Sequence, residues 1–101
     1  MSTEQPILTI SMAAKLLNIH PRSIMLYEHT GIFASFRTGT QRRLFSVKDL
    51  DELQFIKYLT QSKGINLAGV KVILEAIKLA EKEGLELKKL LFPAFKAEQL
   101  I

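Results

Sequence analysis

Apolar and polar residues alternate with a helical period in the first third of the chain. Two short runs, residues 12–17 and 21–30, carry apolar positions three and four apart and are separated by a three-residue turn. Ser11 is suited to cap the first run, and Asn18, which tolerates left-handed backbone, follows it. Pro21 opens the second run, as proline often does in a first helical turn. Two short helices joined by such a turn predict a helix-turn-helix.

The pattern then becomes extended around a turn. Residues 32–37 have extended character, Gly39 lies at the turn, and the chain returns with Arg43 and Phe45 on one face of a strand. These features predict a small β-hairpin beside the helix pair. We call this hairpin, residues 36–46, the wing.

Two longer helical stripes follow the wing. Ser46 and Asp49 fit a capping box, which predicts that a helix starts there, and Gly64 closes it. Asn66 can cap a further helix that ends near Gly84. The apolar positions of both stripes are interpreted as core packing: Leu50, Leu53, Phe55, Ile56 and Leu59, then Leu67, Val70, Ile73, Leu74 and Ile77.

These elements predict a mainly α fold with a small β-hairpin wing. It is a winged helix-turn-helix followed by two helices and a short C-terminal helix. Residues 1–8 are expected to form an N-terminal arm, residues 9–84 the winged helix-turn-helix domain, and residues 85–101 a short dimerisation or lid segment. The last segment is too apolar for an isolated tail, because it carries Leu87, Leu90, Leu91, Phe92 and Phe95.

Composition narrows the class of protein. The chain has 101 residues, the length of one domain, and 48% of them are hydrophobic. The absence of cysteine excludes a disulfide framework, a thiolate metal site and a cysteine nucleophile. Two histidines, His20 and His29, are too few for a metal site of their own. Because Lys, Glu or Gly interrupts the longest apolar runs, no membrane span is expected. The start of the chain has no basic stretch followed by an apolar one, so a signal peptide is not expected either, and the chain is expected to be cytoplasmic.

Positive charge is concentrated in the first half. Residues 1–46 hold five Lys and Arg against two acidic residues, whereas residues 47–101 hold nine Lys against eight. All four arginines lie between positions 22 and 43, and no acidic residue occurs between Glu28 and Asp49. Arginine is the side chain whose planar fork binds phosphates and guanine edges. The distribution favours nucleic-acid binding, although a basic patch can also serve solubility alone.

Three segments carry a family resemblance. They are "ISMAAKLLNIHPRSIMLYEHTGIF", "RTGTQRRLFSVKDLDEL" and "FIKYLTQSKGINLAGVKVIL", and they occur in collinear order over residues 7–77. Together they resemble the MerR family of bacterial transcription regulators. "HPRS" and "GINLAGVK" are most similar to the heat-shock repressor (HspR-like) branch, and "GINLAGVK" and "RRLFS" also resemble the nitrogen regulators coupled to glutamine synthetase.

The resemblance implies a function. We expect a repressor that binds a palindromic operator in double-stranded DNA as a homodimer, with residues 21–30 as recognition helix and residues 36–46 as wing. The protein is then associated with the nucleoid, needs no cofactor or metal, and has a DnaK-type chaperone as its co-regulator. Only about 17 residues follow Gly84, which leaves little room for an effector module.

The resemblance also implies which residues contact DNA. The candidate set is His20, Arg22, Ser23, Tyr27, Arg37, Arg42, Arg43 and Lys57. Arg22 and Ser23 lie in the first turn of the recognition helix, where side chains reach base edges. Three candidates keep a structural alternative: Tyr27 as a core aromatic residue, Lys57 as a solvated lysine, and His20 as a helix cap. Relatives commonly carry arginine where this chain has Met25, which either contacts a thymine methyl group or leaves specificity to Arg22 and the wing.

Other functions remain open at this point. A recombination accessory factor of the excisionase type is also a small winged helix, but it does not need two further capped helices. A protein-interaction module would use the basic strip for an acidic partner. An enzyme is not expected, because the carboxylates near position 49 suit helix capping better than catalysis.

Overall fold

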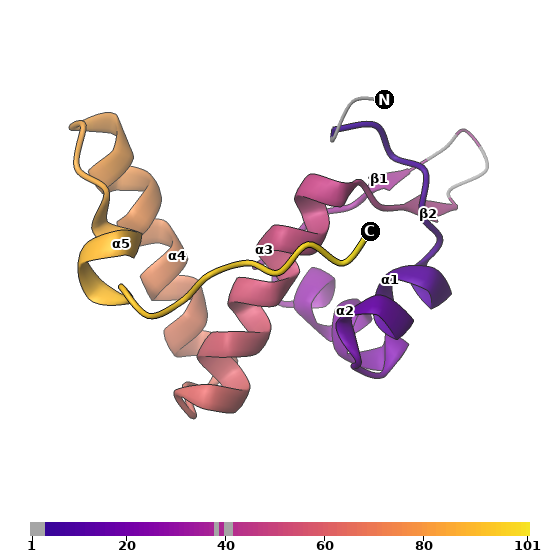
Figure 1. Ribbon diagram of the computed structural model, residues 1–101, viewed down its shortest axis with the longest axis horizontal. Coiled ribbons are helices and arrows are strands. Elements are labelled where there is room, and N and C mark those ends of the chain that lie inside the picture. The colour runs from indigo at the N-terminus through magenta and orange to yellow at the C-terminus, as the bar shows by residue number, and fades with distance from the viewer. Residues whose placement is uncertain (1–3, 38, 40–41) are drawn as a thin grey trace.

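A computed structural model of the chain describes residues 4–37, 39 and 42–101. The elements in chain order are α1 (Ile10–Leu17), α2 (Pro21–His29), β1 (Phe36–Arg37), β2 (Arg43–Leu44), α3 (Val47–Lys57), a π-helical turn η1 (Tyr58–Ser62), α4 (Leu67–Lys82) and α5 (Leu87–Leu91). In Figure 1, α1, α2 and the hairpin lie on one side of α3, and α4 and α5 lie on the other. The predicted mainly helical fold with a β-hairpin wing is confirmed.

The helix-turn-helix forms with the predicted turn. Asn18 ends α1 in left-handed backbone with φ of 56°. Pro21 occupies the first turn of α2, and the His20 side chain caps the helix. Gly31 follows α2 with φ of 81°, a conformation that glycine adopts without strain. Ala13, Ala14, Leu17, Ile24 and Tyr27 are buried where the two helices meet the core.

The start of α1 differs from the prediction. The helix begins at Ile10 rather than Met12, and its N-cap is Thr9, whose side chain accepts a hydrogen bond from the Met12 amide. Ser11 is exposed in the first turn, so its assignment as the cap was wrong. The reason is a contact from far along the chain, because Leu8 forms an isolated antiparallel bridge with Phe45. That bridge holds the chain extended up to Thr9 and releases it into helix one residue later.

The wing is a short antiparallel pair. Phe36 lies opposite Leu44 and Arg37 opposite Arg43. Phe45 is fully buried and stacks on Phe33, with ring centroids 6.0 Å apart. Among the positions of the predicted turn, Gly39 is described, and positions 38, 40 and 41 lie outside the described residues, as do positions 1–3 of the predicted arm. The end of that arm is attached to the wing, since the amides of Ile7 and Leu8 both donate to the Phe45 carbonyl.

The third helix starts with the predicted capping box. The Ser46 hydroxyl accepts from the Asp49 amide at 3.0 Å, and the Asp49 carboxylate accepts from the Ser46 amide at 2.9 Å. The helix then widens into η1, which was not predicted. Thr60 donates through Oγ1 to the carbonyls of Ile56 and Lys57, at 3.0 and 3.1 Å. Such side-chain bonds to the carbonyls of the preceding turn slightly destabilise a regular helix and often bend it.

The C-terminal residues return along α3, as the yellow trace in Figure 1 shows. Gln54 fixes them with two hydrogen bonds to the backbone of Glu98, one to its carbonyl at 2.9 Å and one from its amide at 2.7 Å. Phe92 and Phe95 pack against Phe55 and Tyr58 with ring centroids 5.1 to 6.1 Å apart. Leu87 and Leu100 are partly buried against the core, whereas Leu85, Leu90 and Leu91 are exposed. Residues 85–101 thus cover α3 with one part and present an apolar surface with another.

Candidate nucleic-acid interface

The second helix presents one face to the core and one to solvent. Ile24 is fully buried and Tyr27 is 5% exposed, so this side anchors the helix. Arg22 and His29 are exposed on the other side, one near each end of the helix. Ser23, also in the first turn, is half-buried. The helix can therefore offer its outward face to a partner without disturbing its packing.

The N-terminus of α2 is organised by His20. Its Nδ1 atom accepts a hydrogen bond from the Arg22 amide at 3.0 Å, and the Ser23 amide donates to the His20 carbonyl at 2.9 Å. Because Nδ1 is the acceptor, the neutral ring carries its proton on Nε2. The predicted role as a helix cap is present, and His20 is exposed, so that Nε2–H is able to donate to a phosphate.

Two of the wing arginines meet a carboxylate of α2. Glu28, with its side chain 11% exposed, accepts from Arg37 Nη2 and from Arg43 Nε, each at 3.2 Å. Ser35 donates through Oγ to the same carboxylate, also at 3.2 Å. The cluster carries one net positive charge in place of two. It fixes the wing to α2, because its members come from α2, β1, β2 and the segment before β1.

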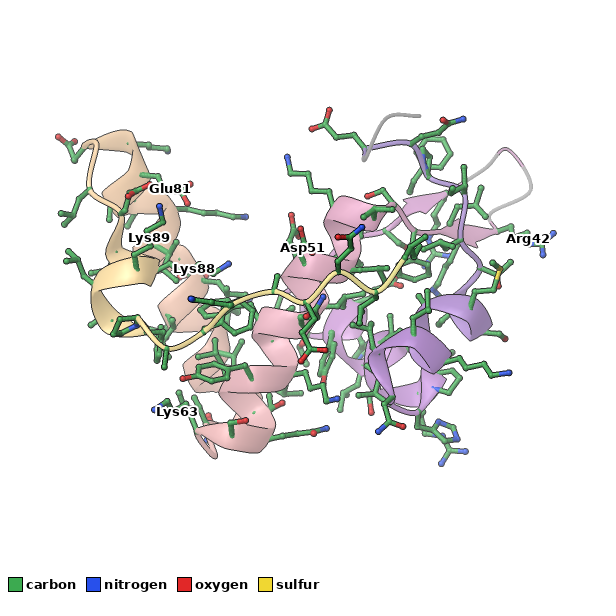
Figure 2. The ribbon with its side chains drawn as sticks, in the orientation of Figure 1. Arg42, Asp51, Lys63, Glu81, Lys88 and Lys89 are labelled. Carbon is green, nitrogen blue, oxygen red and sulfur yellow. The ribbon has the colours of Figure 1, made fainter. Side chains whose placement is uncertain are left out.

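The candidate residues Arg42, Tyr27 and Lys57 lie in different surroundings. Arg42 is exposed just before β2, and Figure 2 shows its side chain projecting outward from the hairpin. Tyr27 is buried, as its interpretation as a core aromatic residue requires. Lys57 is half-buried and donates through Nζ to the Leu17 carbonyl at 2.8 Å. Lys57 therefore satisfies the C-terminus of α1 rather than being simply solvated.

The sequence prediction missed Glu28 as a member of this site. One signal points to it, since Glu28 is the single acidic residue between positions 5 and 48. An isolated carboxylate within a basic strip attracts the arginines around it. The partners lie nine and fifteen residues away, so local patterns could not identify them.

The described residues include neither a metal-ion cluster nor a membrane-spanning helix. Within residues 4–37, 39 and 42–101, no group of three His, Asp or Glu side chains is placed to hold a metal ion. His20 and His29 flank α2 at opposite ends, about 13 Å apart along its axis. Across the described part of the chain, no helix is both long and apolar enough to cross a bilayer.

A helix-turn-helix joined to a two-stranded wing, with arginines on both, defines the class of winged helix-turn-helix domains. Residues 8–77 match the model of the MerR HTH family regulatory protein. The chain belongs to this family, whose members are regulators rather than enzymes.

Individual relatives agree with the family assignment. A putative heat shock protein HspR of Streptomyces coelicolor is 36% identical over 75 residues, covering 74% of this chain and 50% of that protein. The HTH-type transcriptional regulators GlnR of Bacillus anthracis and Bacillus cereus are each 36% identical over 84 residues, covering 76% of this chain and 64% of theirs. The chain thus spans half to about two thirds of the length of these relatives. Both branches that the motifs resemble are represented among them.

Proposed function

We propose that this chain is a sequence-specific transcription repressor that binds a palindromic operator as a homodimer. The observation that carries the proposal is the joint surface of α2 and the wing. Arg22 is exposed in the first turn of the recognition helix, and Glu28 holds Arg37 and Arg43 beside it. One such surface per protomer fits one half-site, with the helix in the major groove and the wing along the backbone.

Charge supports the same role. The first 46 residues carry a balance of +3, against +1 for residues 47–101. Lysine and arginine that neutralise phosphates release counterions, so binding is expected to weaken steeply as salt rises. Glu28 leaves one net positive charge on its cluster with Arg37 and Arg43, and Arg22 and Arg42 each carry a further positive charge.

Dimerisation is assigned to residues 85–101. Leu85, just before α5, and Leu90 and Leu91 within it are 48 to 64% exposed. Three such side chains expose a large apolar area for so short a segment. We assign a DnaK-type chaperone as a co-regulator, with support from the relative named as a heat shock protein. Sedimentation of the purified chain with such a chaperone tests this partner, and separate boundaries at micromolar concentration would contradict it.

Selection of bound duplexes from a random pool tests the function, together with the mass of the complex. We expect an inverted repeat bound by two chains. In the Arg22→Ala variant the preferred base at one position of each half-site should be lost, at a cost of about 1–3 kcal/mol. A pool without enrichment would contradict DNA reading altogether. A single bent site bound by one chain would favour the architectural role instead.

A further inference from the structure

The outward face of α2 has an unusual composition for a helix on a basic surface. Arg22, Met25, Leu26 and His29 are spaced at i, i+3, i+4 and i+7, which places them on one face. All four are exposed, Met25 by 44% and Leu26 by 48%. The buried Ile24 lies on the opposite side of the helix. The centre of the exposed face is therefore apolar, and its two ends are polar.

The surroundings of this apolar pair are positively charged. Met25 and Leu26 line a groove between α2 and the wing, together with Arg22, Arg37 and Arg43. The carboxylate in the groove belongs to Glu28, which already accepts from two arginines at 3.2 Å. An apolar centre with a cationic border fits a polyanion that also carries apolar groups.

Double-stranded DNA has one apolar group among the base edges of its major groove, which is the C5-methyl of thymine. We infer that Met25 and Leu26 read thymine methyl groups, so that each half-site carries thymine opposite this pair. The inference rests on the proposed function, because it takes α2 as the helix that enters the major groove. It adds the identity of the bases that the apolar part of the helix selects.

Helix geometry places the thymines relative to the base read by Arg22. Met25 and Leu26 lie about 4.5–6 Å further along the helix axis than Arg22. Successive base pairs of DNA are about 3.4 Å apart along its axis. A guanine that receives the Arg22 fork should then lie within about two base pairs of the thymines.

Replacement of thymine by deoxyuridine isolates the methyl group, since uracil keeps every hydrogen-bonding group of thymine. The probe is the duplex selected from the random pool, with deoxyuridine placed at one thymine of the half-site at a time. We expect one or two positions at which the change weakens binding about fourfold, the effect of burying one methyl-sized group. In Met25→Ala and Leu26→Ala the ratio of the two affinities should approach one at the position that each side chain reads.

Leu79→Ala is the matched control. Leu79 is an apolar side chain on α4 that is 63% exposed, and it lies outside the groove beside α2. This variant should keep the wild-type ratio of thymine to deoxyuridine affinity, even if its overall affinity changes.

Three results would overturn the inference. A ratio of one at every thymine of the wild-type half-site overturns it alone, since DNA binding itself is then intact. An unchanged ratio of thymine to deoxyuridine affinity in Met25→Ala and Leu26→Ala also overturns it. If these variants then sediment with half the wild-type mass, the face belongs to a contact between copies of the chain. The absence of any enriched duplex would overturn the proposed function and this inference together.

Discussion

Glu28 changes how the wing arginines are interpreted. A carboxylate that is 11% exposed and accepts from two guanidinium groups is paired, which offsets the cost of burying its charge. The side chains of Arg37 and Arg43 are still 39% and 29% exposed, so part of each remains accessible to a partner. Glu28 therefore acts as a positioning residue that orients both forks.

Glu28→Gln should separate orientation from charge. The variant loses the anion that holds Arg37 and Arg43, and we expect a loss of about 1 kcal/mol in the free energy of unfolding. The slope of log affinity against log salt should become steeper by about one unit, because more positive charge can meet phosphate. Preference for the selected operator over random DNA should fall, since the forks lose their fixed direction. Binding titrations at several salt concentrations measure both effects.

Glu4→Gln is the control for this change. It removes the same charge from an exposed ion pair with Lys48, whose side chain is 59% exposed. We expect little change in stability and in preference for the operator. A Glu28→Gln variant with the slope and preference of wild type would show that the two arginines do not meet DNA.

At the scale of the elements, the start of α1 gives a direct test of the cap. Thr9→Ala removes the hydroxyl that accepts from the Met12 amide and should lower the free energy of unfolding by about 1 kcal/mol. Ser11→Ala, in the same turn, should change it by less than about 0.5 kcal/mol. Urea unfolding of both variants measures the difference. The reverse order of the two losses would restore Ser11 as the cap.

The pH dependence of α3 follows from Glu52. Partial burial raises the pKa of this carboxyl above its ordinary value of 4.5, and the neighbouring Asp49 raises it further, against opposing effects of Lys48, Lys78 and Lys88. The folded state thus holds the proton more tightly than the unfolded chain. The stabilisation that comes from holding this proton is fully present below about pH 4.5, the ordinary pKa of the group. It is lost as pH rises through the pKa of Glu52 in the folded state.

Glu52→Gln should therefore stabilise the fold above that range. We expect the free energy of unfolding to rise by about a few tenths of a kcal/mol at pH 7 and not at all well below pH 4. The gain is small because the side chain is partly hydrated. Asp51→Asn removes the same charge from the adjacent position of α3 and serves as the control. Thermal unfolding between pH 3 and 8 measures both variants. An equal gain at all pH values would contradict the assignment.

The elements that the sequence predicted well depend on residues close together in the chain. The capping box of Ser46 and Asp49, the Asn66 cap and the first-turn Pro21 all act within four positions, and all are present. The start of α1 depends on the bridge between Leu8 and Phe45, which no local pattern contains.

Two further features follow from contacts that local patterns do not specify. The π-helical turn coincides with hydrogen bonds from the Thr60 hydroxyl to the carbonyls of Ile56 and Lys57, and periodicity does not report where that hydroxyl points. In the site, the exposure of Arg22 and the cap by His20 are local, whereas the pairing of Glu28 with Arg37 and Arg43 required the wing to fold back onto α2.

At the scale of the whole molecule, substitutions can test separately the two parts of residues 85–101, the aromatic residues that pack on α3 and the exposed leucines. Phe95→Ala removes a ring that packs on Phe55 and Tyr58 and should cost about 2 kcal/mol of stability. A double change of Leu90 and Leu91 to Glu should leave the unfolding of the monomer nearly unchanged, because both are exposed. We expect it to halve the mass in sedimentation equilibrium. A dimer that persists in this variant would place the seam elsewhere.

The path of the last residues has a practical consequence. Residues 97–100 line a shallow pocket with Val47, Leu50 and Asp51 on the first turns of α3, and Leu100 also borders Leu16 and Leu17 of α1. The end of the chain thus lies beside the half of the molecule that carries α2, although α5 lies in the other half, as Figure 1 shows. A fluorophore attached at Ile101 would sit within energy-transfer range of a dye on the operator. A label at this position is therefore expected to report the approach of the proposed operator in real time, without a substitution in α2.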